Sequence, residues 1–134
     1  MKITISGSIQ FEPLMEDVAK KLMTHGHEVI WPSVKDRKGA KVVDDDVKKM
    51  LIKDYFAKIG SSEALLVVNE TKNGIENYIG GSAFMEMTYA FSQGLDIFVL
   101  NPIPDMGYTD EIRGMQPKVL NGNLDLLNGN GGEK

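Results

Sequence analysis

Short apolar runs alternate with longer amphipathic segments along the chain, and this pattern predicts four or five strands separated by helices. The run at residues 2–6 stops at Gly7, and the run at 64–68 is apolar at every position. A continuous apolar run is typical of a parallel strand covered on both faces. Further strands are expected at 27–31, 97–100 and 118–120.

The helices are marked by apolar spacing and by residues that start or stop a helix. Pro13 fits the first turn of one helix, and Gly26 follows its end. Three acids at 44–46 open the next helix and complement its dipole, with a divalent-ion site as the alternative interpretation. Two more helices are expected, from Ser82 to Gly94 and, more briefly, near 109–115.

Regular alternation without internal repeats predicts a single α/β domain. We expect a doubly wound, three-layer sandwich on a parallel sheet, similar to flavodoxin and Rossmann folds. The domain is expected to span 1–122, and 123–134 is expected to be a flexible polar tail. Residues 33–43 and 70–79 are polar and aperiodic, so we expect mobile loops that flank a pocket mouth.

Composition narrows the classes of partner. A net charge of −4 over 134 residues argues against polymeric nucleic acid or an anionic membrane as the main partner. The chain has no cysteine, which excludes disulfides and thiolate chemistry. No apolar stretch is long enough to cross a bilayer, and the first apolar run is too short for a signal peptide, so a cytoplasmic location is expected. No metal or other cofactor is expected.

The most informative residue is Glu86, in a helix start that is otherwise apolar and led by glycine. From Ala83 to Phe91 only Glu86 and Thr88 are polar. A structural Glu at a helix start stands three residues after a Ser or Thr cap, but Ala83 occupies that position. The spacing therefore favours a functional carboxylate over a capping one, with a solvated surface position as the alternative.

The fold predicts where a ligand would bind. In doubly wound sheets, ligands bind beyond the carboxyl ends of the strands, and the helix carrying Glu86 begins at that edge. For Trp31, base stacking and core packing are equally open interpretations. The candidate binding residues at this edge are Gly7, Ser8, Ile9, Trp31, Asn69, Gly80, Gly81, Ser82 and Asn101.

Three segments resemble one protein family as a set. Residues 3–9 resemble the first strand and Gly-Ser turn of the nucleoside 2-deoxyribosyltransferase superfamily, which includes the 2′-deoxynucleoside 5′-monophosphate N-glycosidases. Residues 59–69 resemble its third strand. Residues 78–90, followed by Gly94 and 97–102, resemble its catalytic helix and next strand. The resemblance covers most of 1–121.

This resemblance implies an activity. Glu86 would be the nucleophile that attacks the anomeric carbon of a deoxyribosyl group, and the helix N-terminus would keep it ionised. Gly80, Gly81 and Ser82 would hold the 5′ end of the ligand, with the Gly7 turn near the sugar or base. The substrate would be a nucleoside or nucleoside 5′-monophosphate.

The chain departs from the family pattern at three positions. Thr4 stands where the family often has Tyr, Glu63 where it usually has Asp, and Gly80 where Asp or Ser is common. The leaving base then lacks its usual acid. Glu63 and Asp54 are the two candidates for that role, and the sequence does not choose between them.

Two other functions stay open, together with the assembly. A non-catalytic nucleotide-binding module of the same fold is one alternative. A phosphoribohydrolase-like enzyme is another, because Gly80, Gly81 and Glu86 loosely match the Gly-Gly-x-Gly-Thr-x-x-Glu motif. Surplus apolar residues on two helices predict a homodimer or larger assembly, as does the resembling family. These residues are Met50, Phe56, Met85, Met87, Tyr89 and Phe91.

Overall fold

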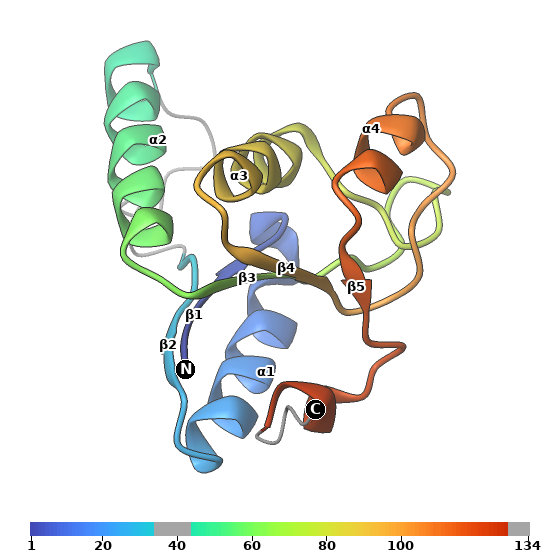
Figure 1. Cartoon of the computed structure of the whole chain (residues 1–134). Helices are drawn as coiled ribbons and strands as arrows, with labels where there is room; N and C mark the ends of the chain where they lie inside the picture. Colours follow the sequence, from blue (N-terminus) through green and yellow to red (C-terminus); the bar gives the residue numbers. More distant parts are fainter. Residues whose placement is uncertain (34–43, 129–134) are drawn as a thin grey trace.

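The computed structural model describes residues 1–33 and 44–128. Strands and helices alternate in the expected order (Figure 1). The strands are β1 (Lys2–Ser6), β2 (Glu28–Ile30), β3 (Ala64–Val67), β4 (Asp96–Val99) and β5 (Lys118–Val119). The helices are α1 (Glu12–Thr24), α2 (Asp45–Gly60), α3 (Gly81–Ser92) and α4 (Thr109–Gly114), with 3₁₀ turns η1 (Ile9–Phe11) and η3 (Leu124–Leu127).

The five strands form one parallel sheet in the order β2-β1-β3-β4-β5. This is the flavodoxin-type order, and the chain changes direction across the sheet between β1 and β3. Helices α2, α3 and α4 cover one face, while α1 and η3 cover the other (Figure 1). The predicted three-layer α/β sandwich is therefore confirmed.

Alternate residues of the central strands enter two separate hydrophobic cores. Leu66 faces the core beneath α1, whereas Leu65 and Val67 face the core beneath α2 and α3. In β1 the second of these faces is polar, because Thr4 and Ser6 occupy it and both are fully buried. Thr4 bonds to Ser62 at 2.6 Å. Ser6 therefore places a buried hydroxyl at the carboxyl end of β1.

The domain extends beyond residue 122. Leu127 is buried in the core beneath α1, and Asn128 Oδ1 lies 2.8 Å from His27 Nε2. The boundary expected at 122 is therefore too early, because η3 supplies apolar cover for the sheet. Residues 129–134 of the expected tail, and 34–43 of the first expected loop, lie outside the described residues.

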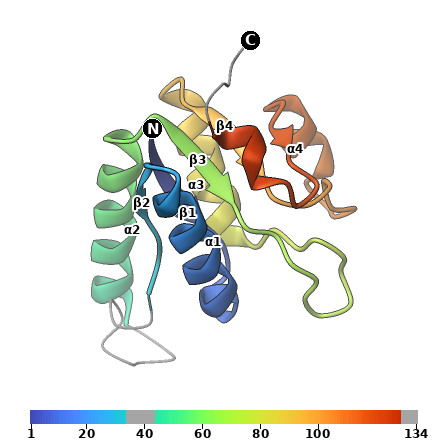
Figure 2. The ribbon, with the colours of Figure 1, turned by 90° about the horizontal axis from the view of Figure 1, so that it is seen from below.

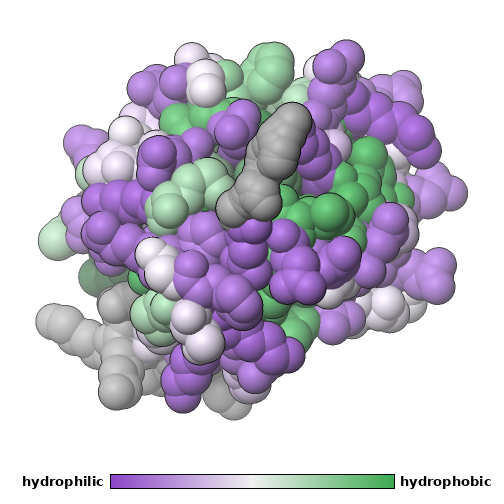
Figure 3. Space-filling view, turned by 60° about the horizontal axis from the view of Figure 1, so that its bottom comes forward, coloured by the Kyte–Doolittle hydropathy of each residue, from purple (hydrophilic) through white to green (hydrophobic). Residues whose placement is uncertain are grey.

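The face formed by α1 and the C-terminal segment is mostly hydrophilic, with its hydrophobic side chains in separate patches (Figure 3). Exposed apolar side chains occur on both sides of the sheet: Met23 on α1 and Leu126 on η3, and Val47, Met50, Met85 and Phe91 on α2 and α3. Met87, which was expected among the surplus residues, is fully buried in the core.

No helix in the described part of the chain is long and apolar enough to span a membrane.

Candidate active site

A cavity of about 310 Å³ opens at the carboxyl ends of β1 and β3. The helices α1, α2 and α3 begin near this end of the sheet, and the loop at 70–79 projects beside it (Figure 2). The turn after β1, the first turn of α3 and one side of α2 all contribute to the lining. The cavity therefore lies where the strand order reverses, as expected for this fold.

Glu86 lines this cavity from the second turn of α3. Its carboxylate Oε1 accepts a hydrogen bond from the hydroxyl of Ser6, which is fully buried at the end of β1. The contact between β1 and α3 thereby fixes the position of one oxygen of the Glu86 carboxylate. Ser6 was not among the residues predicted from the sequence. A polar residue at the end of a buried strand is the signal that could have found it.

Burial raises the pKa of Glu86 from its ordinary value of 4.5 to about 7. The Ser6 hydrogen bond and the charge of Lys48 act in the opposite direction and lower it. The expectation that the helix N-terminus would keep Glu86 fully ionised is therefore wrong. The cost of removing the charged carboxylate from water exceeds the stabilisation that Ser6 and Lys48 give to its charged form.

The start of α3 confirms that Glu86 has no capping role. Gly80 is the N-cap and has no side chain to bond the first turn. Glu86 then lies beyond the position from which a capping box reaches back. Gly81 and Ser82 line the cavity, and a Cβ on Gly81 would meet no atom within 4 Å. The first-turn N–H groups of α3 have no acceptor within the helix and suit an anion.

The turn after β1 requires its glycine. A Cβ on Gly7 would lie 2.9 Å from the carbonyl oxygen of Val68 and 3.0 Å from Met15 Sδ. Such a contact with backbone cannot be relieved by moving a side chain. Gly7 thus allows β1 and β3 to end close together, with Gly7, Ser8 and Ile9 all lining the cavity.

Two lysines and two tyrosines, which the sequence did not single out, also line the cavity: Lys48, Lys72, Tyr55 and Tyr78. Lys72 Nζ donates to Ser8 Oγ at 3.1 Å and lies 5.3 Å from the centre of the Tyr78 ring. The Tyr55 hydroxyl donates to the carbonyl of Ile5. Both lysines belong to segments whose local sequence gives no motif, so only the three-dimensional arrangement identifies them.

Asn69 and Asn101, predicted to bind ligand, bond to each other instead. The side-chain amide of Asn69 donates to the carbonyls of Asn101 and Pro102 at 3.0 and 3.1 Å. Its Oδ1 accepts from Asn101 N at 2.9 Å, and Asn101 Nδ2 donates to Asn69 O at 2.8 Å. The pair joins the ends of β3 and β4, and neither residue lines the cavity.

Trp31 is partly buried and packs against the core beneath α1, which favours the packing interpretation. Its neighbours Pro32 and Ser33 line the cavity, but Trp31 does not. A tryptophan one residue before the cavity edge therefore belongs to the core.

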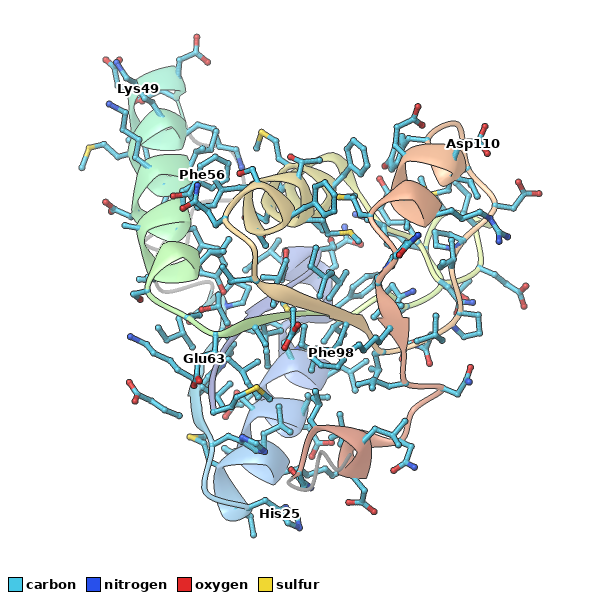
Figure 4. The ribbon with its side chains drawn as sticks, in the orientation of Figure 1. His25, Lys49, Phe56, Glu63, Phe98 and Asp110 are labelled. Carbon is cyan, nitrogen blue, oxygen red and sulfur yellow. The ribbon has the colours of Figure 1, made fainter. Side chains whose placement is uncertain are left out.

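Neither proposed acid lines the cavity that contains Glu86. Glu63, labelled in Figure 4, accepts from Lys2 N through its Oε1 at 2.7 Å, and Lys2 begins β1 whereas Ser6 ends it. Four residues of strand separate those ends by roughly 13 Å. Asp54 is exposed on α2 and does not line the cavity. In the described residues, Glu86 is the one carboxylate of the cavity lining.

Asp44 has a local role in place of the alternative ion site. Its Oδ1 accepts from Val47 N at 2.9 Å, so it is the N-cap of α2. The described residues hold no cluster of three or more carboxylates or imidazoles able to ligate a metal. The acidic run therefore starts a helix, as its first interpretation proposed.

Two solved structures are similar to this chain over most of its length. A 2-deoxyribosyltransferase from Bacillus psychrosaccharolyticus superposes with a TM-score of 0.54 at 16% identity, covering 76% of this chain and 73% of its own. The CMP N-glycosidase BcmB of Clostridium botulinum gives 0.55 at 16% identity, with 89% and 85% covered. The chain shares their fold. No family model and no curated protein sequence matches it.

Proposed function

We propose that this protein belongs to the nucleoside 2-deoxyribosyltransferase superfamily and cleaves or transfers the N-glycosidic bond of a nucleoside or nucleoside 5′-monophosphate. The observation that carries the proposal is the Glu86 carboxylate, which is held by Ser6, lines a ligand-sized cavity and has no capping role. The shared fold supports it, since both structural neighbours are enzymes that act on such bonds by name.

In this proposal Glu86 acts as a nucleophile. The Ser6 hydroxyl orients Oε1. One carboxylate oxygen attacks the anomeric carbon, the C–N bond breaks, and the base departs with the bonding electrons and then takes a proton. The transition state resembles an oxocarbenium ion, which a negative oxygen stabilises. Water, or a second base, then attacks the glycosyl-enzyme and releases Glu86.

The raised pKa sets the pH at which this chemistry begins. Attack requires an ionised carboxylate, and at neutral pH about half of the Glu86 side chains are protonated in the free protein, because their pKa is about 7. We therefore expect kcat/KM to rise about tenfold per pH unit below pH 7 and to level off above it.

A non-catalytic nucleotide-binding module is the second candidate. It is favoured by one observation: neither Glu63 nor Asp54 reaches the cavity, so the described lining offers no second carboxylate to protonate the leaving base. This alternative predicts binding of nucleotides without release of free base.

The test is incubation with a panel of ribo- and deoxyribonucleosides and their 5′-monophosphates, following free base by chromatography. Active protein should lose at least about 1000-fold in kcat in Glu86→Gln, while substrate still binds. Glu111→Gln, an exposed change of the same kind in α4, is the matched control. Turnover by Glu86→Gln at the parent rate would end the nucleophile assignment.

We further propose a homodimer or larger assembly. Met50, Met85 and Phe91 are 63, 36 and 54% exposed on α2 and α3, and Met85 also lines the cavity. Covering these side chains would bring a second copy close to the active site. Light scattering at micromolar concentration should give at least twice the mass of one chain, and a monomeric mass would refute this assembly.

A further inference from the structure

The cavity holds a cation that the proposed chemistry at Glu86 does not use. Lys72, on the loop after β3, points its ammonium to the hydroxyl of Ser8 at 3.1 Å. The same ammonium lies 5.3 Å from the centre of the Tyr78 ring, and all three residues line the cavity. An ammonium and a hydroxyl side by side offer several hydrogen-bond donors to one anion.

The charge balance of the cavity points to an anionic ligand. Its described lining carries two lysines, Lys48 and Lys72, against one carboxylate, Glu86. This local excess of positive charge occurs in a chain whose net charge is −4. Three ion pairs occur among the described residues, and they engage Lys2, Lys20 and Lys21. Lys72 therefore carries a charge that no described carboxylate balances.

The position of this cation relative to Glu86 fits one part of a nucleotide. Glu86 bonds to Ser6, and Lys72 bonds to Ser8, two residues further along the same chain. The Cα atoms of Ser6 and Ser8 are at most about 7 Å apart, and Glu86 and Lys72 both line the same cavity. In a nucleoside 5′-monophosphate, the phosphate is separated from the anomeric carbon by the furanose ring and one methylene. The first turn of α3, with Gly81 and Ser82 in the lining, adds N–H donors to the same cavity.

We propose that Lys72 and Ser8 recognise the 5′-phosphate of the substrate, so that the protein selects nucleoside 5′-monophosphates over nucleosides. This inference rests on the proposed function, because it places the anomeric carbon at Glu86. Lys72 is a specificity-determining residue here, and Ser8 shares the phosphate with it. A neutral nucleoside would leave the ammonium with Ser8 alone.

The experiment measures binding apart from turnover. Glu86→Gln protein is titrated by calorimetry with deoxynucleoside 5′-monophosphates, the matching nucleosides and inorganic phosphate. Monophosphates should bind at least about tenfold more tightly than nucleosides. Adding Lys72→Met should weaken the monophosphates by roughly 10- to 100-fold and leave nucleosides unchanged, because a charge-assisted hydrogen bond is lost. Lys72→Arg should retain most of the preference.

Lys49→Met is the matched control. Lys49 is exposed on α2, on the side turned away from the sheet (Figure 4), and its loss changes the net charge equally. It should leave every affinity within about twofold. Urea unfolding of each variant reports whether the fold has changed.

Two results would overturn the inference: nucleosides that bind as tightly as their monophosphates, or Lys72→Met weakening both ligands equally in a folded protein. Turnover by protein with Glu86 intact is followed on the same panel. Phosphate-dependent binding without release of base would refute the proposed enzyme and support the phosphate site. Release of base from nucleosides and monophosphates at equal kcat/KM would refute the phosphate site and support the enzyme.

Discussion

Replacing Glu86 with Gln should stabilise the protein while removing the proposed activity. Glu86 has a pKa of about 7 in the folded protein against an ordinary value of 4.5, a difference of about 2.5. Between these two pH values the folded protein binds a proton that the unfolded chain has released. The free energy of unfolding therefore falls as the pH rises through this range. Gln has the same shape, can accept the Ser6 hydrogen bond, and carries no charge to bury.

The size of the effect follows from the same difference. One pKa unit corresponds to about 1.4 kcal/mol, so ionised Glu86 costs the folded state at most about 3.5 kcal/mol above pH 7. The side chain is partly exposed to the cavity, which relieves some of this cost. We expect Glu86→Gln to gain about 1–3 kcal/mol at pH 8 and less than about 1 kcal/mol at pH 5.

Urea unfolding at both pH values measures this gain, with the fluorescence of Trp31, the one tryptophan in the chain, as the probe. Trp31 packs against the core beneath α1, and it does not line the cavity that contains Glu86. Glu111→Gln, exposed on α4, should change stability by less than about 0.5 kcal/mol at either pH. An equal gain at pH 5 and pH 8, or a loss at pH 8, would show that Glu86 is not held in the environment described here.

Three further predictions concern the surroundings of the carboxylate. Lys48→Met should move the acidic limb of the pH–activity profile upward, because Lys48 lowers the pKa of Glu86, whereas the exposed Lys49→Met should not. An unmoved limb would exclude that interaction. Asn69→Ala should lower the free energy of unfolding by roughly 3 kcal/mol, since it removes three hydrogen bonds to the end of β4, and a loss below about 1 kcal/mol in urea would contradict this. Gly7→Ala should cost about 1–3 kcal/mol by the same measurement, because its Cβ would meet a backbone carbonyl at 2.9 Å, and an unchanged unfolding midpoint would refute the close approach.

The sequence predicted those parts of the fold and site that are marked by residues close together in the chain. The apolar run that contains β3 indicated a strand buried on both faces, and residues of that strand do enter both cores. Glu86 was found because Ala83, three residues before it, is a poor cap, and the structure agrees, since the N-cap is Gly80. Each inference needed only residues within a few positions of one another.

Other parts of the site depend on contacts that no local pattern contains. Ser6 and Glu86 are 80 positions apart. Their hydrogen bond depends on which face of the sheet the Ser6 side chain occupies and on which side of α3 is turned toward that face. Asn69 and Asn101 were correctly placed at strand ends but bond to each other, because two amides on adjacent parallel strands complement one another. Lys72 stands in a loop, where no periodicity indicates its direction.

Glu63 and Glu86 show how the two ends of the sheet differ. Both carboxylates accept a hydrogen bond from β1, Glu63 from Lys2 N at its start and Glu86 from Ser6 at its end. Glu63 is exposed, directly precedes β3, and its hydrogen bond to Lys2 N joins the beginnings of β3 and β1. Glu86 is withdrawn from water until its pKa reaches about 7, an arrangement that costs stability and has no structural use that we can identify. Costs of that kind concentrate at functional sites, so the unfavourable burial of Glu86 is itself an argument that the carboxyl end of the sheet is the reactive one.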